Sequence, residues 1–284
     1  MSEKKLLLAA LLRENIRNNV DFRAVLSSLA ERKLGKSKLD AESFADANIR
    51  RYWNWITKEI DLQSSRGIVP FFTFADNGGY SFSSITYDLL SSSCQSNKKL
   101  GKLVSLRPST LNQIDSLTER EYEALSCVVC SKIGSIKVKL TPPGNEGGID
   151  FFATISVKNA SHIFSAIGSE VRIVGQCKKY KAPVQVDRLD QFISTLQNVR
   201  HRSDRVRKHI PSWFSESRGP IVGWIIAHSG FQTGTADEAK NHGIILSDSL
   251  DLAEVLCTSI VGDVDNICPD TFAQAISDEC RMFL

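Results

Sequence analysis

Val171-Arg-Ile-Val-Gly-Gln-Cys-Lys-Lys-Tyr180 is the stretch that decides the fold, and we expect it to form a strand. Alternate side chains of a strand share a face of the sheet. Gln176 and Lys178 should therefore point the same way, while Cys177 points into the opposite layer. The strand thus presents an amide and a cation together.

The elements around this strand predict an α/β domain over residues 113–284. Thr118 and Glu121 have the spacing of a capping box at the start of a helix. A continuous apolar run over 221–227 predicts a fully covered central strand. Strands alternating with helices imply a mixed central sheet flanked by helices on both faces. The other expected elements are strands at 135–140, 149–157 and 243–246, and helices from about 186 and at 235–241, 250–260 and 270–284.

Residues 1–112 predict a smaller, mostly helical N-terminal domain. The first 60 residues have a helical pattern, with Asp40 as the expected N-cap of one helix. Two aromatic segments flank Asp76-Asn77-Gly78-Gly79, which favours a β-hairpin. The Ser- and Lys-rich stretch 91–102 is expected to be a linker. This order is compatible with a winged-helix module that contacts DNA, and equally with an oligomerisation or accessory domain.

Composition places the chain among globular proteins without a membrane span. Charged residues make up 24% and hydrophobic residues 42% of its 284 residues. The apolar run from Leu6 to Leu12 is too short to cross a bilayer, so we expect a cytoplasmic protein. The seven cysteines are scattered and odd in number, which favours reduced thiols. Cys127 and Cys130 are expected to be buried small side chains, because no second pair completes a zinc site.

One segment after residue 199 is strongly basic, although the net charge is only +3. A cluster of cations in a short stretch can contact DNA phosphates or can simply form a solvated surface. Both interpretations stay open for Arg200, Arg202, Arg205, Arg207 and Lys208.

Four polar residues form a candidate catalytic site. Asp150 follows two glycines, Gly147 and Gly148, at the start of a predicted strand, and Gln176 and Lys178 lie on the next one. A phosphodiester-cleaving site needs a carboxylate and a second oxygen ligand for Mg²⁺, and a cation that orients water and offsets charge. These three residues supply those groups, and Glu123 on the preceding helix is a candidate fourth member.

Five segments of the second domain resemble, in order, the Mrr-like restriction endonuclease family of the PD-(D/E)xK nuclease superfamily. They are Glu121-Tyr-Glu123, Gly144-Asn-Glu-Gly-Gly-Ile-Asp150, Val174-Gly-Gln-Cys-Lys-Lys-Tyr180, Ala227-His-Ser-Gly-Phe231 and Ala236-Asp-Glu-Ala-Lys-Asn-His-Gly-Ile244. The resemblance covers roughly 113 to 260. It implies a Mg²⁺-dependent DNA endonuclease, with Mn²⁺ as a substitute metal, in bacterial restriction or anti-phage defence.

The resemblance also assigns roles to the candidate residues. By position, Asp150 matches the metal-binding aspartate, Gln176 the residue that replaces an acidic ligand, and Lys178 the catalytic lysine. Glu123 matches the helix glutamate that completes many such sites. Gln176 is neutral and so leaves fewer negative charges to hold Mg²⁺. The interval between Asp150 and Gln176 is longer than expected for the family, which a longer hairpin would explain.

Two other function classes remain as alternatives. The first is a regulated or weakly active subunit that keeps the nuclease fold and binds DNA within a larger defence or DNA-processing complex. The second is a hydrolase with Cys177 as nucleophile, which strand alternation disfavours because Cys177 faces away from Gln176 and Lys178. For the nuclease we expect double-stranded DNA as substrate, a homodimer that supplies two active sites, and a protein partner in a defence system.

Overall fold

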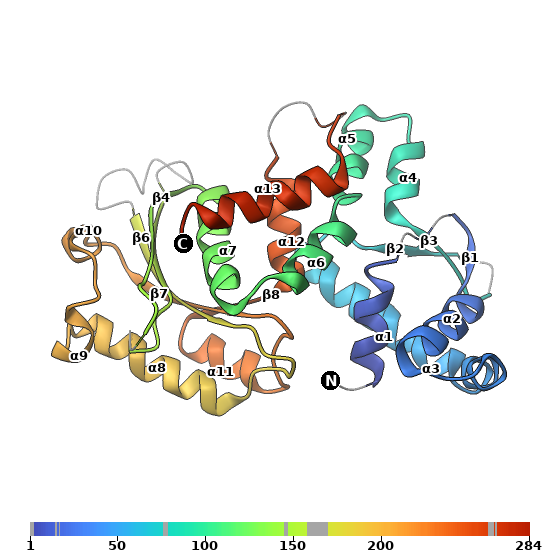
Figure 1. Ribbon diagram of the computed structural model, residues 1–284, viewed down its shortest axis with the longest axis horizontal. Coiled ribbons are helices and arrows are strands. Elements are labelled where there is room, and N and C mark those ends of the chain that lie inside the picture. Colours follow the sequence, from blue (N-terminus) through green and yellow to red (C-terminus); the bar gives the residue numbers. More distant parts are fainter. Residues whose placement is uncertain are drawn as a thin grey trace. The chain divides into compact units, whose positions relative to one another are not determined.

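The computed structural model describes residues 3–14, 16, 18–75, 79–144, 147–157, 170–260, 264 and 266–284 (Figure 1). The chain forms two compact units. The first comprises Met1–Asn112 with Ile260–Pro269, and the second comprises Gln113–Ser259 with Asp270–Leu284. Among the described residues, no helix is both long enough and apolar enough to cross a membrane.

The first unit combines helices with a small antiparallel sheet. Its strand order is β1-β3-β2, and β2 and β3 form the predicted hairpin, with Phe72 opposite Ser84. The predicted turn residues 76–78 lie outside the described residues. The elements in chain order are α1 (Glu3–Leu11), β1 (Val20–Asp21), α2 (Phe22–Leu34), α3 (Lys38–Ser65), β2 (Phe72–Phe74), β3 (Ser81–Ser84), α4 (Ile85–Ser91), α5 (Gln95–Val104) and α6 (Arg107–Ser116), whose last residues belong to the second unit.

Two predictions for this unit were wrong. Ser37, not Asp40, is the N-cap of α3, and its hydroxyl accepts a hydrogen bond from the backbone N–H of Asp40 at 3.2 Å. The stretch 91–102 is not a linker, because most of it lies in α5. Leu103 and Val104 at the end of that helix are buried, and this apolar anchor outweighs the linker-like composition that precedes it.

Aromatic side chains fill the core between α2, α3 and the hairpin. Phe72 and Phe82 are buried, and Trp53 of α3 makes edge contacts with Phe22 and Phe74, with ring centroids 5.4 and 4.9 Å apart. Such pairs stabilise a core beyond the area they bury. The hairpin aromatics therefore serve mainly in packing.

The second unit is built on a mixed sheet, as predicted, and its five strands have the order β4-β5-β6-β7-β8. Strands β4, β5 and β6 run antiparallel, and β6, β7 and β8 run parallel. Helices α7 and α12 cover one face and α8 and α11 the other (Figure 1). The elements are α7 (Glu119–Lys132), β4 (Ser135–Leu140), β5 (Phe151–Ser156), β6 (Glu170–Lys178), α8 (Val186–Arg200), α9 (Asp204–Arg207), α10 (Ser212–Glu216), β7 (Ile221–Ala227), α11 (Thr235–Asn241), β8 (Ile244–Asp248), α12 (Ser249–Thr258) and α13 (Pro269–Arg281).

The start of α7 and the packing of α8 agree with the sequence pattern. Thr118 and Glu121 form the predicted capping box. On the α8 side of the sheet, one buried cluster joins strand residues to the apolar stripe of the helix. This cluster includes Phe152, Val174, Leu189, Phe192, Leu196 and Ile225.

Gly175 lets β5 and β6 pair closely beside the candidate site. It lies opposite Phe151 in the ladder, and a Cβ at Gly175 would be 2.0 Å from the Phe151 ring. That ring also packs edge-on against Trp224 of β7, with centroids 5.9 Å apart. The glycine therefore fixes how the three central strands fit together on the α7 side.

Candidate active site

Asp150 is placed by the point at which β5 begins. The ladder between β5 and β6 starts with Phe151 opposite Gly175, so Asp150 lies just beyond it, beside Gln176. The N–H of Asp150 donates to the carbonyl of Gly175 at 2.9 Å. Its Oδ2 accepts a hydrogen bond from the N–H of Cys177 at 2.6 Å. Beyond the end of the β5–β6 ladder, the carboxylate thus supplies the acceptor that a paired strand would otherwise offer to the N–H of Cys177, and it is held against the end of β6.

Gln176 is held by the two glycines that precede Asp150. Its Nε2 donates to the carbonyl of Gly148 at 2.8 Å, and the side chain is only 8% exposed. Gly147 and Gly148 have φ values of 70° and 84°, in the region that favours glycine. The backbone can therefore approach the amide closely, as the Gly-Gly pair predicted. This hydrogen bond commits the amide nitrogen and leaves the oxygen to act as an acceptor or ligand.

Lys178 stands at the last position of β6, two residues beyond Gln176 and on the same face of the strand. It is partly exposed, and its Nζ lies 5.9 Å from the centroid of the Tyr180 ring. Its carbonyl accepts a hydrogen bond from the N–H of His228 at 2.9 Å, which ties the strand end to β7. The backbone of the lysine is fixed while its side chain reaches solvent.

Glu123 lies on α7, which covers the face of the sheet opposite to Gln176, and it is paired with an arginine. Its Oε2 accepts from Nη1 of Arg120 at 2.6 Å, and the side chain is 25% exposed. Arg120 also donates to the carbonyl of Thr141 at 2.6 Å. The N–H of Thr141 donates in turn to the carbonyl of Asp150 at 2.9 Å. Glu123 and Asp150 are therefore linked through the end of β4.

The donor atoms suit a hard divalent cation. Carboxylate oxygens of Asp150 and Glu123 and the amide oxygen of Gln176 are of the type that Mg²⁺ prefers. Within the described residues, no three His, Cys, Asp or Glu side chains are grouped closely enough to hold a metal ion. A metal at this site would therefore need the Gln176 oxygen, and Glu123 would have to exchange its partner Arg120 for the ion or for a water bound to it.

Cys177 faces the opposite layer, as strand alternation predicted. It is buried, and its Sγ lies 3.0 Å from Oγ of Ser126 on α7. Burial, and secondarily the nearby carboxylate of Asp150, raise the pKa of this thiol well above its usual value. A buried neutral thiol is a poor nucleophile, which argues against the cysteine hydrolase alternative.

The family follows from comparison with known proteins. A family model described as Mrr_cat, restriction endonuclease, matches residues 114–256, which lie within the second unit and span half of the chain. The chain belongs to the Mrr_cat restriction endonuclease family. The matched region contains all four candidate residues and the whole central sheet. The mixed sheet is thus a restriction-endonuclease-like fold.

Two solved structures resemble part of this Mrr_cat protein. One is the DNA modification-dependent restriction endonuclease AspBHI, 17% identical with a TM-score of 0.41, covering 64% of this chain and 40% of its own. The other is the MspJI restriction endonuclease in complex with a 27-mer oligonucleotide, 18% identical with a TM-score of 0.37, covering 66% and 39%. The chain thus spans about 40% of the length of each. A search of curated proteins gave no match.

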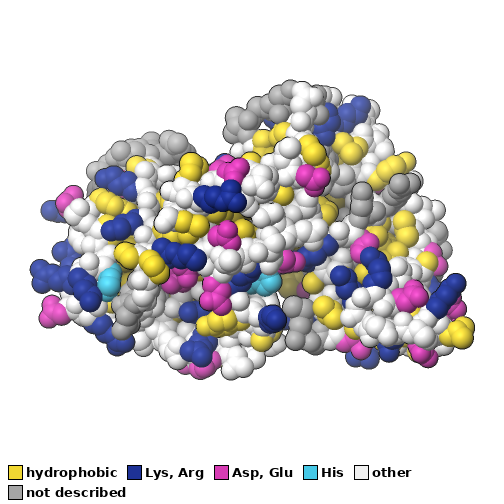
Figure 2. Space-filling view, in the orientation of Figure 1, with side chains coloured by type: hydrophobic (Ala, Val, Ile, Leu, Met, Phe, Trp, Pro, Cys, Tyr) yellow, Lys and Arg dark blue, Asp and Glu magenta, His cyan; other side chains and the backbone are white. Residues whose placement is uncertain are grey.

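The basic segment of the Mrr_cat domain lies at the end of α8 and in α9. All five predicted cations are exposed, and Figure 2 shows Lys and Arg side chains gathered along the edge where Figure 1 draws α9. Two of them are engaged with the protein. Nη2 of Arg200 donates to the carbonyl of Ile221 at 3.0 Å, and Nη2 of Arg202 donates to that of Ser215 at 2.7 Å. The segment is an exposed cationic surface with two of its members partly fixed.

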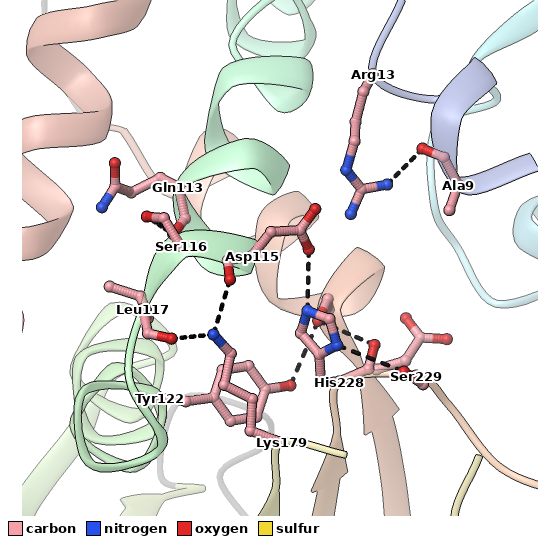
Figure 3. A network of polar contacts seen from close by, with 12 residues as sticks. Ala9, Arg13, Gln113, Asp115, Ser116, Leu117, Tyr122, Lys179, His228 and Ser229 are labelled. Atoms are coloured by element: carbon pink, nitrogen blue, oxygen red, sulfur yellow. Dashed lines mark hydrogen bonds and ion pairs between the residues drawn. The ribbon is translucent and has the colours of Figure 1, made fainter. Parts of the chain in front are cut away.

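A polar network that the sequence did not reveal ties the start of the Mrr_cat domain to the ends of β6 and β7 (Figure 3). Nζ of Lys179 donates to the carbonyl of Asp115 at 2.9 Å and to that of Leu117. Nε2 of His228 lies 2.9 Å from Oδ1 of Asp115. Burial lowers the pKa of Lys179. The residue after the candidate lysine is thus an anchor for the segment before α7, which only the folded arrangement could show.

Proposed function

We propose that this Mrr_cat protein is a metal-dependent DNA endonuclease that hydrolyses phosphodiester bonds in double-stranded DNA. The observation that best supports this proposal is the register of β5 and β6, which places Asp150 beside Gln176. In this position the Asp150 carboxylate accepts a hydrogen bond from the N–H of Cys177 at 2.6 Å. The family supports the same reaction. Mg²⁺, or Mn²⁺ in its place, would be held by Asp150, Gln176 and Glu123.

Each residue has a distinct task in this reaction. A metal ion held by Asp150, Gln176 and Glu123 would supply Lewis-acid chemistry at the scissile phosphate. Asp150 presents a carboxylate whose direction is fixed by its hydrogen bond to β6. Gln176 presents a neutral oxygen from a nearly buried, hydrogen-bonded amide. Lys178 carries the positive charge that orients the attacking water and stabilises the negative charge on the pentacoordinate phosphorus.

Plasmid cleavage in Mg²⁺ tests the assignment. Asp150→Ala and Lys178→Ala should each lower the cleavage rate by about 10²-fold or more, since each removes a group that stabilises the transition state. Lys181→Ala is the matched control, because this exposed lysine lies three residues beyond Lys178. Unchanged cutting by both site variants would overturn the proposed active site.

The ion pair between Glu123 and Arg120 favours the alternative of a regulated subunit. A glutamate held at 2.6 Å by an arginine must be released before it can take part in metal binding. Regulation could act on that release. Under this alternative the wild-type protein binds DNA and does not cut it, whereas Arg120→Gln raises cutting. Efficient cutting by wild-type protein without any partner would remove this alternative.

We further propose that the first unit is a second DNA contact. Its order α1-β1-α2-α3-β2-β3, with the strands arranged β1-β3-β2, is that of a winged-helix module. The third helix of such a module enters the major groove. On α3 the exposed residues include Arg50, Arg51, Asn54 and Lys58, whose side chains suit phosphates and base edges.

We propose that the protein acts in bacterial restriction or anti-phage defence, alone as a homodimer or with a protein partner. Family membership supports this setting. Two active sites allow both strands to be cut in one encounter. A homodimer should therefore convert supercoiled plasmid directly to linear DNA, and light scattering should give twice the mass of the chain. A monomeric mass, with nicked circles as the main product, would contradict the dimer.

A further inference from the structure

A polar pocket of about 390 Å³ opens beside the candidate active site within the second unit. Gly148 and Gln176 form one wall, and residues of α8 form another. The α8 residues that face it include Gln191, Ser194 and Asn198, and Arg205 of α9 completes the lining. The volume lies in the range of pockets that hold a ligand. Because Gln176 belongs to both places, whatever fills the pocket lies next to the proposed site of cleavage.

The lining has the chemistry of a site for a phosphodiester backbone. It contains amides, hydroxyls and a guanidinium, and no described residue that lines it is acidic. Phosphate and sugar oxygens are bound in proteins by such groups, namely Arg, Ser, Thr, Asn and Gln side chains and backbone N–H groups. The pocket is thus suited to an anionic group, such as a phosphodiester, whose oxygens and neighbouring sugar oxygens form hydrogen bonds with these side chains.

Arg205 differs in position from the other four cations of the basic segment. It alone among them lines the pocket. Arg200 and Arg202 donate to backbone carbonyls of the protein. Arg207 lies on the same short helix as Arg205 and is also exposed, but it is not part of the lining. A comparison of substitutions at Arg205 and Arg207 therefore distinguishes a specific contact in the pocket from a general effect of positive surface charge.

We propose that this pocket binds the backbone of the DNA strand being cut, at a phosphate next to the one that is hydrolysed. Arg205 contacts that phosphate, and Gln191, Ser194 and Asn198 hydrogen-bond to phosphate or sugar oxygens. The strand then passes Gln176 on its way to Asp150 and Lys178. This inference rests on the proposed endonuclease function and adds to it the track of the cleaved strand.

The first experiment measures whether the effect of the Arg205 charge on DNA affinity depends on one particular phosphate. Short duplexes each carry one neutral methylphosphonate, scanned across the bound region, and affinities are measured without a divalent metal so that no cutting occurs. At one phosphate, the methylphosphonate and Arg205→Gln should each weaken binding about tenfold, and together no more than either alone. For Arg207→Gln the two losses should multiply at that phosphate. Independent losses for Arg205→Gln at every phosphate would overturn the inference.

The scan separates this inference from the proposed function. Coupling of Arg205 to one phosphate, in a protein that does not cut DNA, supports the pocket and refutes the nuclease. Cutting of DNA without any such coupling refutes the pocket and leaves the nuclease. If affinity depends on Arg205 together with one base, as shown by an abasic substitution, and on no phosphate, the pocket binds a base and the inference is wrong.

Filling the pocket gives a second test. Ser194→Trp places a large ring in the space, whereas Gln197→Trp places the same ring on an exposed position of α8 outside the lining. Thermal unfolding checks that both variants fold. Ser194→Trp should weaken duplex binding about tenfold or more, and Gln197→Trp should stay within about twofold of wild type. Equal affinities for the two variants would contradict the proposal.

Discussion

At the scale of single residues, the candidate site depends on a glycine that allows Gln176 to lie against the backbone. A Cβ at Gly148 would lie 3.1 Å from Nε2 of Gln176 and 3.4 Å from Oγ1 of Thr195. The φ of 84° adds backbone strain for any other residue. The position therefore combines a conformational requirement with a steric one.

Gly148→Ala should separate these two effects. We expect a loss of about 1 kcal/mol in the free energy of unfolding from the positive φ, and a larger loss of cleavage because the Gln176 amide is displaced. Gly134→Ala is the control, since its φ is 89° and, apart from its chain neighbours, no atom of the described residues lies within 4 Å of its Cβ position. Urea unfolding and plasmid cleavage measure both. If the two variants cut equally well, the placement of Gln176 does not matter for catalysis.

The faces that Gln176, Cys177 and Lys178 occupy on β6 could be predicted from the sequence because strand alternation is local. Gln176 and Cys177 face opposite layers, as their spacing requires, and a contact with α7 confirms it for Cys177. Arg120 and Glu123 have the local i, i+3 spacing of a helical ion pair, but the contact of Arg120 with the carbonyl of Thr141 at the end of β4 could not be predicted. The long interval 158–169 before β6 lies outside the described residues, so its expected hairpin stays a prediction.

At the scale of secondary structure elements, amphipathic segments were predicted well and short or composition-biased ones were not. The apolar stripe of α8 predicts the helix. The polar stripe has the same helical spacing but does not by itself indicate a pocket; it comprises Gln191, Ser194, Thr195 and Asn198. The two-residue strand β1 is too short to leave a pattern, and it is defined only by its pairing with β3.

Helix α3 carries the prediction for the first unit. Arg50→Glu with Arg51→Glu should weaken duplex binding about tenfold or more and reduce its salt dependence, because two phosphate-seeking cations are reversed on one exposed face. Lys33→Glu with Lys99→Glu is the control, with the same change of charge on α2 and α5. Titrations at several salt concentrations compare them. Equal losses for both pairs would show that net charge matters and that α3 does not.

At the scale of the whole molecule, the buried thiols should lower the free energy of unfolding at alkaline pH. None of the seven cysteines forms a disulfide, and five of them are buried. Burial raises the pKa of Cys130 and Cys280 to about 12, and it also raises the pKa values of Cys127 and Cys177 well above the usual range. A raised pKa in the folded state means that the unfolded chain ionises first. Stability is then complete below the usual thiol pKa and falls as pH rises above it.

Urea unfolding at pH 8 and pH 10 tests this link. Each buried thiol should contribute a loss of up to roughly 2 kcal/mol at pH 10, since an unfolded thiol ionises near pH 8.5. Cys130→Ala should reduce the pH dependence by about that amount, whereas Cys268→Ala, at an exposed position, should leave it unchanged. The same pH dependence in all three proteins would mean that other groups cause it.

The segment Ile260–Pro269 belongs to the first unit, although it follows almost all of the second in the chain. During synthesis, residues 1–112 leave the ribosome long before this segment exists. At about 5–20 residues per second, the delay is on the order of ten seconds. The nascent first unit therefore lacks part of its contacts during this interval, while the central sheet of the second unit has time to form. The unit whose synthesis begins first is completed late.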